Sequence, residues 1–169
     1  MGGGRGPQRG GGRGGDSRGR GPMRERVKPE FDQKIIDLRR VTRVVAGGKR
    51  FNFSVHIIAG DRKGRVGVGT GKAGDTASAI DKALKSAKKN MITLKLTKEN
   101  SIRHSVDSKY SSATVFIRPA PGRGMIAGSA LRNVLELGGV KHVNGKILSS
   151  SKNKLNIARA SIEALKKLS

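Results

Sequence analysis

The sequence predicts an α+β protein made of two small domains joined by a polar connector. In the first half, three strand-like runs precede one amphipathic helix and a further short strand. In the second half, strand-like and helical runs alternate. We expect a first domain over 29–98, a connector over 99–112 and a βαβα domain over 113–169. Domains of about 70 residues or fewer lie near the lower size limit for independent stability, so docking onto a partner is expected to contribute.

A tail precedes the first domain. Residues 1–28 are rich in arginine and glycine and offer almost nothing to bury. They are therefore predicted to be disordered. Arginines on a flexible chain can follow an RNA backbone. A solubilising tail has the same composition, so both interpretations stay open.

The first two strands are expected to form a hairpin. A strand-like run that begins near Phe31 ends at Val45 and carries basic residues on at least one side. Residues 46–50 are predicted to be the loop. From Phe51 to Ile57, apolar and polar residues alternate, which is typical of a half-buried strand. His56 falls on the polar side, where we expect a surface histidine because no second metal ligand stands at a suitable spacing.

A basic turn, a glycine-rich strand and a helix follow. The turn over 60–64 is expected to be a basic hairpin tip, with glycines free to adopt positive φ. Gly67 and Gly69 alternate with Val66 and Val68. One face of this strand is therefore bare backbone, which another chain or a sugar-phosphate could approach closely.

The helix is expected to open at Gly71-Lys72, with Asp75 as a plausible N-cap. Its predicted apolar stripe consists of Ala77, Ile80, Ala83, Leu84, Ala87 and Met91. A second stripe is basic and consists of Lys82, Lys85, Lys88 and Lys89. Such a stripe is either a solvated face or a nucleic-acid contact, and the pattern alone leaves both open.

The later elements are predicted from periodicity and from turn residues. Gly138-Gly139 is expected to stop the second helix. In order, we expect a short strand over 92–97, a buried strand over 114–117, a turn over 119–124, a helix over 126–135, one or two short strands within 143–148, and a final helix from about 156 to 168.

Composition narrows the function classes. The chain has 36 basic and 12 acidic residues and a formal net charge of +24. Such a field attracts polyanions, so nucleic acid is the first candidate partner and an anionic membrane surface the second. The absence of cysteine excludes disulfides, zinc ribbons and thiol catalysis. With four Phe, one Tyr and no Trp, phosphate and shape contacts are expected rather than extensive base stacking.

No apolar run is long enough to span a membrane and no leader is evident, so we expect a cytoplasmic protein without a membrane partner.

Two nucleotide-binding patterns are incomplete. Residues 69–74 match G-x-G-x-x-G, but the preceding strand is interrupted by glycine, and no acidic residue follows where one would hold a ribose. The phosphate-loop pattern fails because Val66 replaces its first glycine and Ala73 replaces its Ser or Thr. Paired carboxylates, a nucleophile elbow and a histidine-rich constellation are missing from the sequence. We therefore expect no catalytic residues, metal, cofactor or small-molecule substrate.

A set of short motifs spreads over roughly residues 30–168. They are Gly48-Lys49-Arg50-Phe51, Gly60-Asp61, Gly64-Arg65-Val66-Gly67, Gly69-Thr70-Gly71-Lys72-Ala73, Lys88-Lys89-Asn90-Met91, Pro119-Ala120-Pro121, Ile126-Ala127-Gly128 and Val134-Leu135-Glu136-Leu137. Together they resemble the family of bacterial small-subunit ribosomal protein five. The turn over 121–124 departs from the family pattern: it is one residue shorter, and Arg123 stands where threonine is common.

The resemblance implies a fold and a function. It implies an N-terminal sheet with one helix, similar to the double-stranded-RNA-binding fold, and a C-terminal four-stranded sheet with two helices. It also implies a structural protein, not an enzyme, that binds small-subunit ribosomal RNA and lies beside ribosomal proteins four and eight. Such a protein supports translational accuracy near the channel by which messenger RNA enters the subunit. A free RNA chaperone or annealing factor is the alternative from another class.

The resemblance also implies site residues. The loop over 43–50 would insert among RNA helices, and Lys72 and Lys88-Lys89 would face RNA. Arg123, Gly124 and Arg132 are expected at the interface with ribosomal protein four. Together with the basic turn and the lysine stripe, the residues expected to bind RNA are Arg40, Arg43, Gly47, Gly48, Lys49, Arg50, Arg62, Lys63, Arg65, Lys72, Lys82, Lys85, Lys88 and Lys89.

Overall fold

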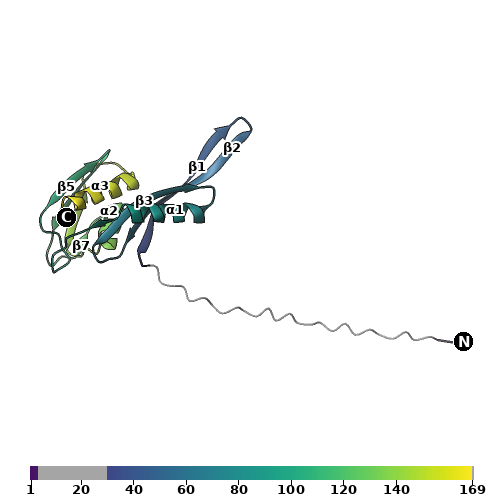
Figure 1. Ribbon diagram of the computed structural model, residues 1–169, viewed down its shortest axis with the longest axis horizontal. Helices are drawn as coiled ribbons and strands as arrows, with labels where there is room; N and C mark the ends of the chain where they lie inside the picture. Colours follow the sequence, from purple (N-terminus) through teal and green to yellow (C-terminus); the bar gives the residue numbers. More distant parts are fainter. Residues whose placement is uncertain (4–29, 169) are drawn as a thin grey trace.

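A computed structural model describes residues 1–3 and 30–168 of the chain (Figure 1). Within them lie two four-stranded sheets and three helices, which confirms the predicted α+β class. All but the first three residues of the predicted tail lie outside the described residues. None of the described helices is long and apolar enough to cross a membrane.

The first sheet is an antiparallel meander with the strand order β1-β2-β3-β4. As predicted, three strands precede a helix, and a short strand follows it. The two outer strands differ greatly in length, because β4 pairs through only two residues. The elements are β1 (Asp32–Val45), β2 (Gly48–Gly60), β3 (Arg65–Ala73), α1 (Thr76–Lys89) and β4 (Ile92–Thr93).

Helix α1 begins later than its sequence predicted. Asp75 is the N-cap, as expected, and its carboxylate accepts a hydrogen bond from the backbone N–H of Ala77 at 3.1 Å. The expected opening at Gly71-Lys72 is wrong. Both residues continue β3, where they pair with Val55 and Ser54 of β2, and this ladder keeps them extended.

The glycines of β3 make room for α1. An added Cβ at Gly67, Gly69 or Gly71 would collide with the backbone of the helix. The helix residues that face this strand are Ala79, Ala83 and Ala87, all fully buried. The buried side of the helix therefore differs from the predicted apolar stripe, which included the exposed Ala77. The bare strand face is covered by the chain's own helix and is not open to a sugar-phosphate.

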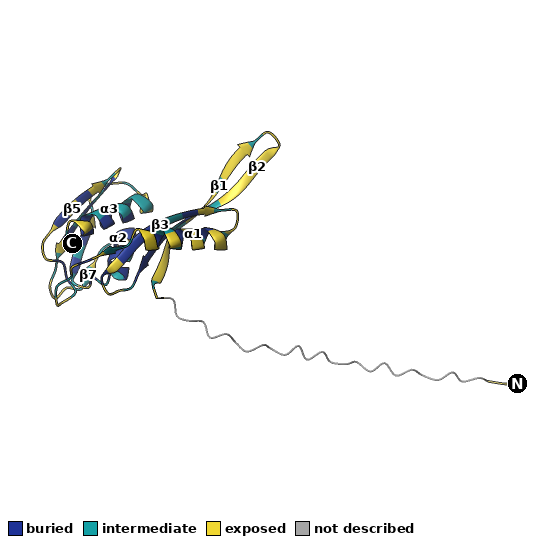
Figure 2. Cartoon of the chain, in the orientation of Figure 1, coloured by how far each residue is buried: buried dark blue, intermediate teal, exposed yellow. Residues whose placement is uncertain are grey.

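The opposite face of the first sheet packs on the second half of the chain. Ile58, Val66 and Val68 belong to one continuous hydrophobic cluster with residues of the second sheet and its helices. The β1 register shift between Ile35 and Asp37 accompanies burial of Ile36 in the same cluster. The inner half of β2 is therefore buried on both faces, where its sequence predicted a half-buried strand. Figure 2 shows the burial concentrated where the two halves meet.

His56 lies on the same face of β2 as Ile58 and is half-buried. Its Nδ1 is buried and has no hydrogen-bond partner among the described residues. Burial is the main cause that lowers the pKa of His56. The charge of Asp37 acts to raise this pKa, while the charges of Arg39, Arg159 and Lys72 lower it further. The prediction of a surface histidine thus holds only in part, because His56 is half-buried.

The second sheet has the order β5-β6-β8-β7, with β7 and β8 parallel and the other neighbours antiparallel. Strand β5 lies inside the range expected as a connector, so that range is not purely a connector. Gly138 caps α2 and Gly139 has φ of +79°, as a helix stop requires. The elements are β5 (Val106–Tyr110), β6 (Ala113–Pro119), β7 (Met125–Ile126), α2 (Ser129–Leu137), β8 (Val143–Ile147) and α3 (Lys154–Lys166).

The turn over 60–65 docks on the end of α2. The backbone N–H of Arg62 donates to the carbonyl of Leu137 at 2.9 Å. A Cβ at Gly60 would collide with the Leu137 carbonyl group, and one at Gly139 would collide with the Arg62 backbone. These close approaches fix the first sheet against the second half of the chain.

Candidate nucleic-acid interface

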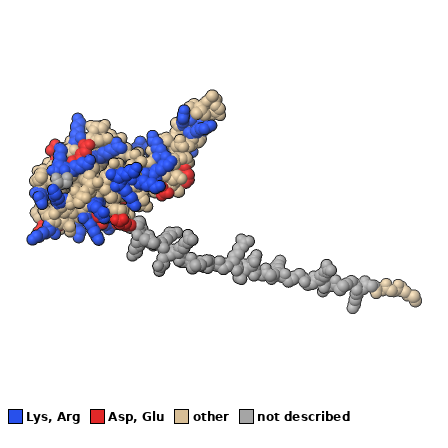
Figure 3. Space-filling model, in the orientation of Figure 1, with Lys and Arg blue, Asp and Glu red and all other residues tan. Residues whose placement is uncertain are grey.

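Cationic side chains cover much of the molecule. Figure 3 shows one face of the protein, with Lys and Arg over α1, on the projecting hairpin of β1 and β2, and also over the second half of the chain. Acidic side chains on this face are few. Two cationic surfaces therefore lie on the first sheet and its helix.

The lysines of α1 form the first surface, here called the lysine face: Lys82, Lys85, Lys88 and Lys89. All four are exposed, because burial of Ala79, Ala83 and Ala87 turns the other sides of the helix toward solvent. None of the four forms an ion pair with a described residue. Lys88 lies 5.3 Å from the centre of the Phe31 ring. The structure thus brings the predicted lysine stripe together as an unneutralised surface.

Lys88 and Lys89 lie in the last turn of α1. The unpaired carbonyls there carry the negative end of the helix dipole, which favours cations. This attraction offsets part of the repulsion among neighbouring lysines. Lys72 is exposed and lies on β3, whereas the sequence predicted it at the start of the helix.

The tip of the β1–β2 hairpin forms the second surface. The expected loop over 46–50 is shorter than predicted, because β2 begins at Gly48 and only Ala46 and Gly47 separate the strands. Gly48 has φ of +130°, a conformation that favours glycine. A Cβ at Gly47 or Gly48 would meet no atom within 4 Å, so the tip is open on all sides.

Cations line both strands of this tip. Arg43 pairs with Arg50 across the ladder, and Val44 pairs with Lys49. The Arg40 guanidinium lies 4.6 Å from the centre of the Phe51 ring, which orients it on the strand surface. All of these residues are exposed. A narrow projecting ribbon of this charge can enter a groove or a gap between nucleic-acid helices.

The turn over 60–65 differs from the expected basic tip. Arg62 Nε lies 2.8 Å from the Asp32 carboxylate, and Arg65 Nε lies 2.7 Å from that of Asp61. Arg65 also lies 3.5 Å from the carboxylate of Glu30. Much of the charge of both arginines is therefore neutralised within the chain. Lys63 is exposed and forms no ion pair with a described residue.

Asp61 organises this turn. Its carboxylate accepts hydrogen bonds from the backbone N–H groups of Lys63 and Arg65 at 2.8 and 2.9 Å, and from Arg65 Nε at 2.7 Å. Burial acts to raise the pKa of Asp61, but these hydrogen bonds and the charge of Arg65 outweigh it and hold the pKa below its ordinary value. Asp61 lies within the turn, whereas Asp32 and Glu30 lie outside it, so the local sequence could not reveal the pairs that these two form.

The residues expected at a protein interface lie at two places on the second domain. Arg123 is exposed in a turn, and Gly124 follows it with φ of +72° and accepts a hydrogen bond from the N–H of Val143 at 3.1 Å. Arg132 is exposed on α2. All three expected residues thus lie at or near the surface.

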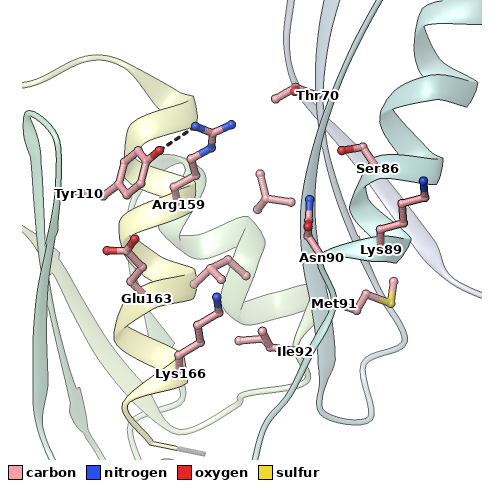
Figure 4. Close-up of a pocket in the computed structure, with 12 residues that line it drawn as sticks. Thr70, Ser86, Lys89, Asn90, Met91, Ile92, Tyr110, Arg159, Glu163 and Lys166 are labelled. Carbon is pink, nitrogen blue, oxygen red and sulfur yellow. Dashed lines mark hydrogen bonds between the residues drawn. The ribbon is translucent and has the colours of Figure 1, made fainter.

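The sequence analysis did not predict a cleft that lies between the two halves of the chain. It has a volume of about 480 Å³, and β3, α1 and β4 form one wall while β5 and α3 form the other (Figure 4). Its residues come from separate elements, so no local spacing marks them. Elsewhere, the described residues contain no group of three His, Asp or Glu side chains that could hold a metal ion.

Comparison with known proteins yields a consistent result. Residues 31–95 match the family described as "Ribosomal protein S5, N-terminal domain", and residues 108–169 match "Ribosomal protein S5, C-terminal domain". The protein "Small ribosomal subunit protein uS5" of Gloeobacter violaceus is 47% identical over 146 residues, which cover 86% of this chain and 65% of that protein.

Two relatives named "Small ribosomal subunit protein uS5c" are similarly close. That of Emiliania huxleyi is 45% identical over 140 residues, covering 82% of this chain and 87% of the relative. That of Spinacia oleracea is 46% identical over 143 residues, covering 84% of this chain. The matched part is only 46% of the length of the spinach protein.

Proposed function

The chain belongs to the ribosomal protein S5 family, and from this premise we propose that it is a structural, RNA-binding constituent of the small ribosomal subunit. In this role it has no catalytic step and no cofactor. It acts by holding segments of ribosomal RNA in place, in the subunit and therefore in the compartment where translation occurs.

The observation that supports RNA binding most directly is the lysine face on α1 beside the projecting cationic hairpin. Four exposed, unpaired ammonium groups along one helix can follow a phosphate backbone. The hairpin is thin enough to enter between RNA helices, and its arginines can donate to phosphates in pairs. Because both surfaces belong to one sheet and its helix, they can fix two RNA segments relative to each other.

We propose that the residues expected from the sequence contact RNA, but that they contribute unequally to the affinity. The lysine face, Lys72 and the hairpin residues at 40, 43 and 47–50 carry the main contacts. Lys63 can add one. Arg62 and Arg65 already pair with Asp32 and Asp61 at the surface, and these carboxylates compete with phosphate, so we expect a smaller contribution from the two arginines.

The protein neighbours follow from the family resemblance. We propose that Arg123, Gly124 and Arg132 face ribosomal protein four, and that ribosomal protein eight is a second neighbour. Messenger RNA would pass nearby, at the channel by which it enters the subunit, and the protein would support accuracy of decoding there. Exposure of the arginines and the open turn at Gly124 are compatible with such contacts.

The test is sedimentation of a lysate through a density gradient after a high-salt wash, with detection by immunoblot. An integral subunit protein is expected with the small subunit at near-unit stoichiometry, because shape and protein contacts hold it when salt screens its charges. Recovery only in the light fractions would contradict this. It would instead favour a free RNA annealing factor, for which the net charge of +24 is equally suitable.

A further inference from the structure

The cleft between the two halves has the volume of a ligand site. Its volume of about 480 Å³ lies within the usual range of roughly 300–1,000 Å³ for pockets that hold small organic groups. Figure 4 shows Ser86 and Asn90 on one side of the opening and Tyr110 of β5 and Arg159 of α3 on the other. The pocket exists only because the two halves of the chain are docked.

The lining of the cleft includes buried apolar residues, here called its floor, and polar residues. Val68 and Ile162 are buried, and Ile92 is half-buried. Among the polar lining residues, the side chains of Thr70 and Ser86 form no hydrogen bond with any described residue. The same holds for the Asn90 amide, which also lines the opening. The cleft therefore offers an apolar surface and free donors and acceptors at the same place.

The rim is cationic and carries an aromatic ring. The Arg159 guanidinium donates to the Tyr110 hydroxyl at 2.8 Å and lies 5.5 Å from the centre of that ring. Lys89 stands on the opposite wall, and Glu163 contributes a single negative charge among the lining cations. An anion with a flat apolar part fits this combination of charge and surface.

Lys89 connects the cleft to the lysine face. It belongs to that face and also lines the opening, so an RNA backbone that follows α1 passes the mouth of the cleft. Proteins that bind RNA in a sequence-dependent way commonly accept unpaired bases, which stack on aromatic rings or guanidinium planes and form hydrogen bonds along their edges. The base of a nucleotide is flat and has hydrogen-bonding edges, and the phosphate of the nucleotide supplies the negative charge.

We propose that this cleft receives one unpaired nucleotide of the bound RNA. The base packs on the apolar floor beside Tyr110 and Arg159, its edge meets Ser86, Thr70 or Asn90, and its phosphate lies near Lys89. This inference rests on the proposed function, because it needs an RNA held along α1. It adds recognition of an unpaired base to contacts that are otherwise made to the backbone.

The test compares RNA hairpins that have identical stems, using the full chain and fluorescence anisotropy. One hairpin is fully paired, and four others carry a single bulged A, C, G or U. Stacking of one base should make at least one bulged hairpin bind about tenfold more tightly than the paired one. Ser86→Phe, which fills the cleft, should remove this preference, whereas Ser78→Phe at an exposed position of the same helix should keep it.

A second variant avoids filling the cleft. Arg159→Gln keeps a polar side chain but loses the guanidinium plane, and it should reduce the preference severalfold. Circular dichroism verifies that each variant is folded. Equal affinity of the wild type for all five hairpins would overturn the cleft inference and leave the proposed function standing. A preference that survives in both cleft variants would also overturn it. Failure of the wild type to bind any hairpin would instead contradict RNA binding itself.

Discussion

Gly69 of β3 and Ala87 of α1 lie so close that a Cβ on Gly69 would stand 2.8 Å from the Cα of Ala87. Real Cβ atoms do not approach other carbons this closely, so the helix can lie on the strand only if both sides are small. The spacing of glycines on the strand and alanines on the helix thus sets the position of the lysine face above the sheet.

Replacing Gly69 with alanine should therefore destabilise the fold. The added methyl group forces backbone to move, and such overpacking typically costs about 1–3 kcal/mol or more. The free energy of unfolding, from urea titration followed by circular dichroism, measures the effect. Gly47→Ala is the matched control, because a Cβ there meets no atom within 4 Å. Equal stability of the two variants would show that α1 can shift without loss.

The shared core predicts that the two halves unfold together. Ile58 is fully buried in the cluster that spans both halves, so Ile58→Ala should lower the free energy of unfolding by about 2–5 kcal/mol. The single tyrosine of the chain, Tyr110, lies in the second half and reports on it by fluorescence. We expect its midpoint in urea to fall together with that of the circular dichroism signal.

The control for this experiment is Ile35→Ala, since Ile35 is 47% exposed on β1. This variant should move neither midpoint by much. If Ile58→Ala lowered the circular dichroism midpoint while the tyrosine signal stayed unchanged, the halves would be independent folding units.

Neutralising the lysine face should weaken the salt dependence of RNA binding. Each phosphate contact that is lost lowers the slope of log affinity against log salt concentration by about 0.7–0.9. We therefore expect a flatter slope when Lys82, Lys85, Lys88 and Lys89 are changed to glutamine. Affinities measured by filter binding over a range of salt concentrations give the slope.

A matched control removes the same charge from other surfaces. Lys95, Lys98, Lys109 and Lys154 are exposed and can be changed to glutamine together. This variant should keep most of the slope, since its lysines lie outside the proposed surfaces. An equal slope for the α1 variant and the wild type would mean that the lysine face is only a solvated face.

Asp61 should contribute to stability in a pH-dependent way. Hydrogen bonds in the folded turn hold its pKa below the ordinary value of 3.8, so the ionised form is favoured by folding. The contribution is complete above that value and is lost as the pH falls through the lower, folded pKa. Asp61→Asn should therefore reduce stability near neutral pH and flatten the acid part of the stability curve.

Urea titrations between pH 2 and pH 7 measure this dependence, with the pH range chosen around the carboxylate pKa. Asp81→Asn is the control, because Asp81 is exposed and forms no ion pair with a described residue. Identical curves for Asp61→Asn and the wild type would contradict the role of the turn in fixing the two halves.

The sequence alone determined most of the elements and some of their ends. Periodicity predicted the strands and helices of the first half in order, Asp75 predicted the cap of α1, and Gly138-Gly139 predicted the end of α2. It missed β5, which lies in the expected connector, and β7, which ends where the second helix was expected to begin. These features depend on neighbours along the chain: a cap bonds to its own first turn, and a glycine supplies its own φ. The excess of basic residues and the lysine spacing are likewise readable from composition and helix geometry.

Only the tertiary structure decided which surfaces remain available. It turned the bare face of β3 toward α1, buried part of His56, and paired Arg62 with Asp32 and Arg65 with Glu30. It also formed the cleft from residues of separate elements. The physical reason is that packing and ion pairing join side chains that are distant in the sequence, and periodicity contains no information about which distant face a residue will meet.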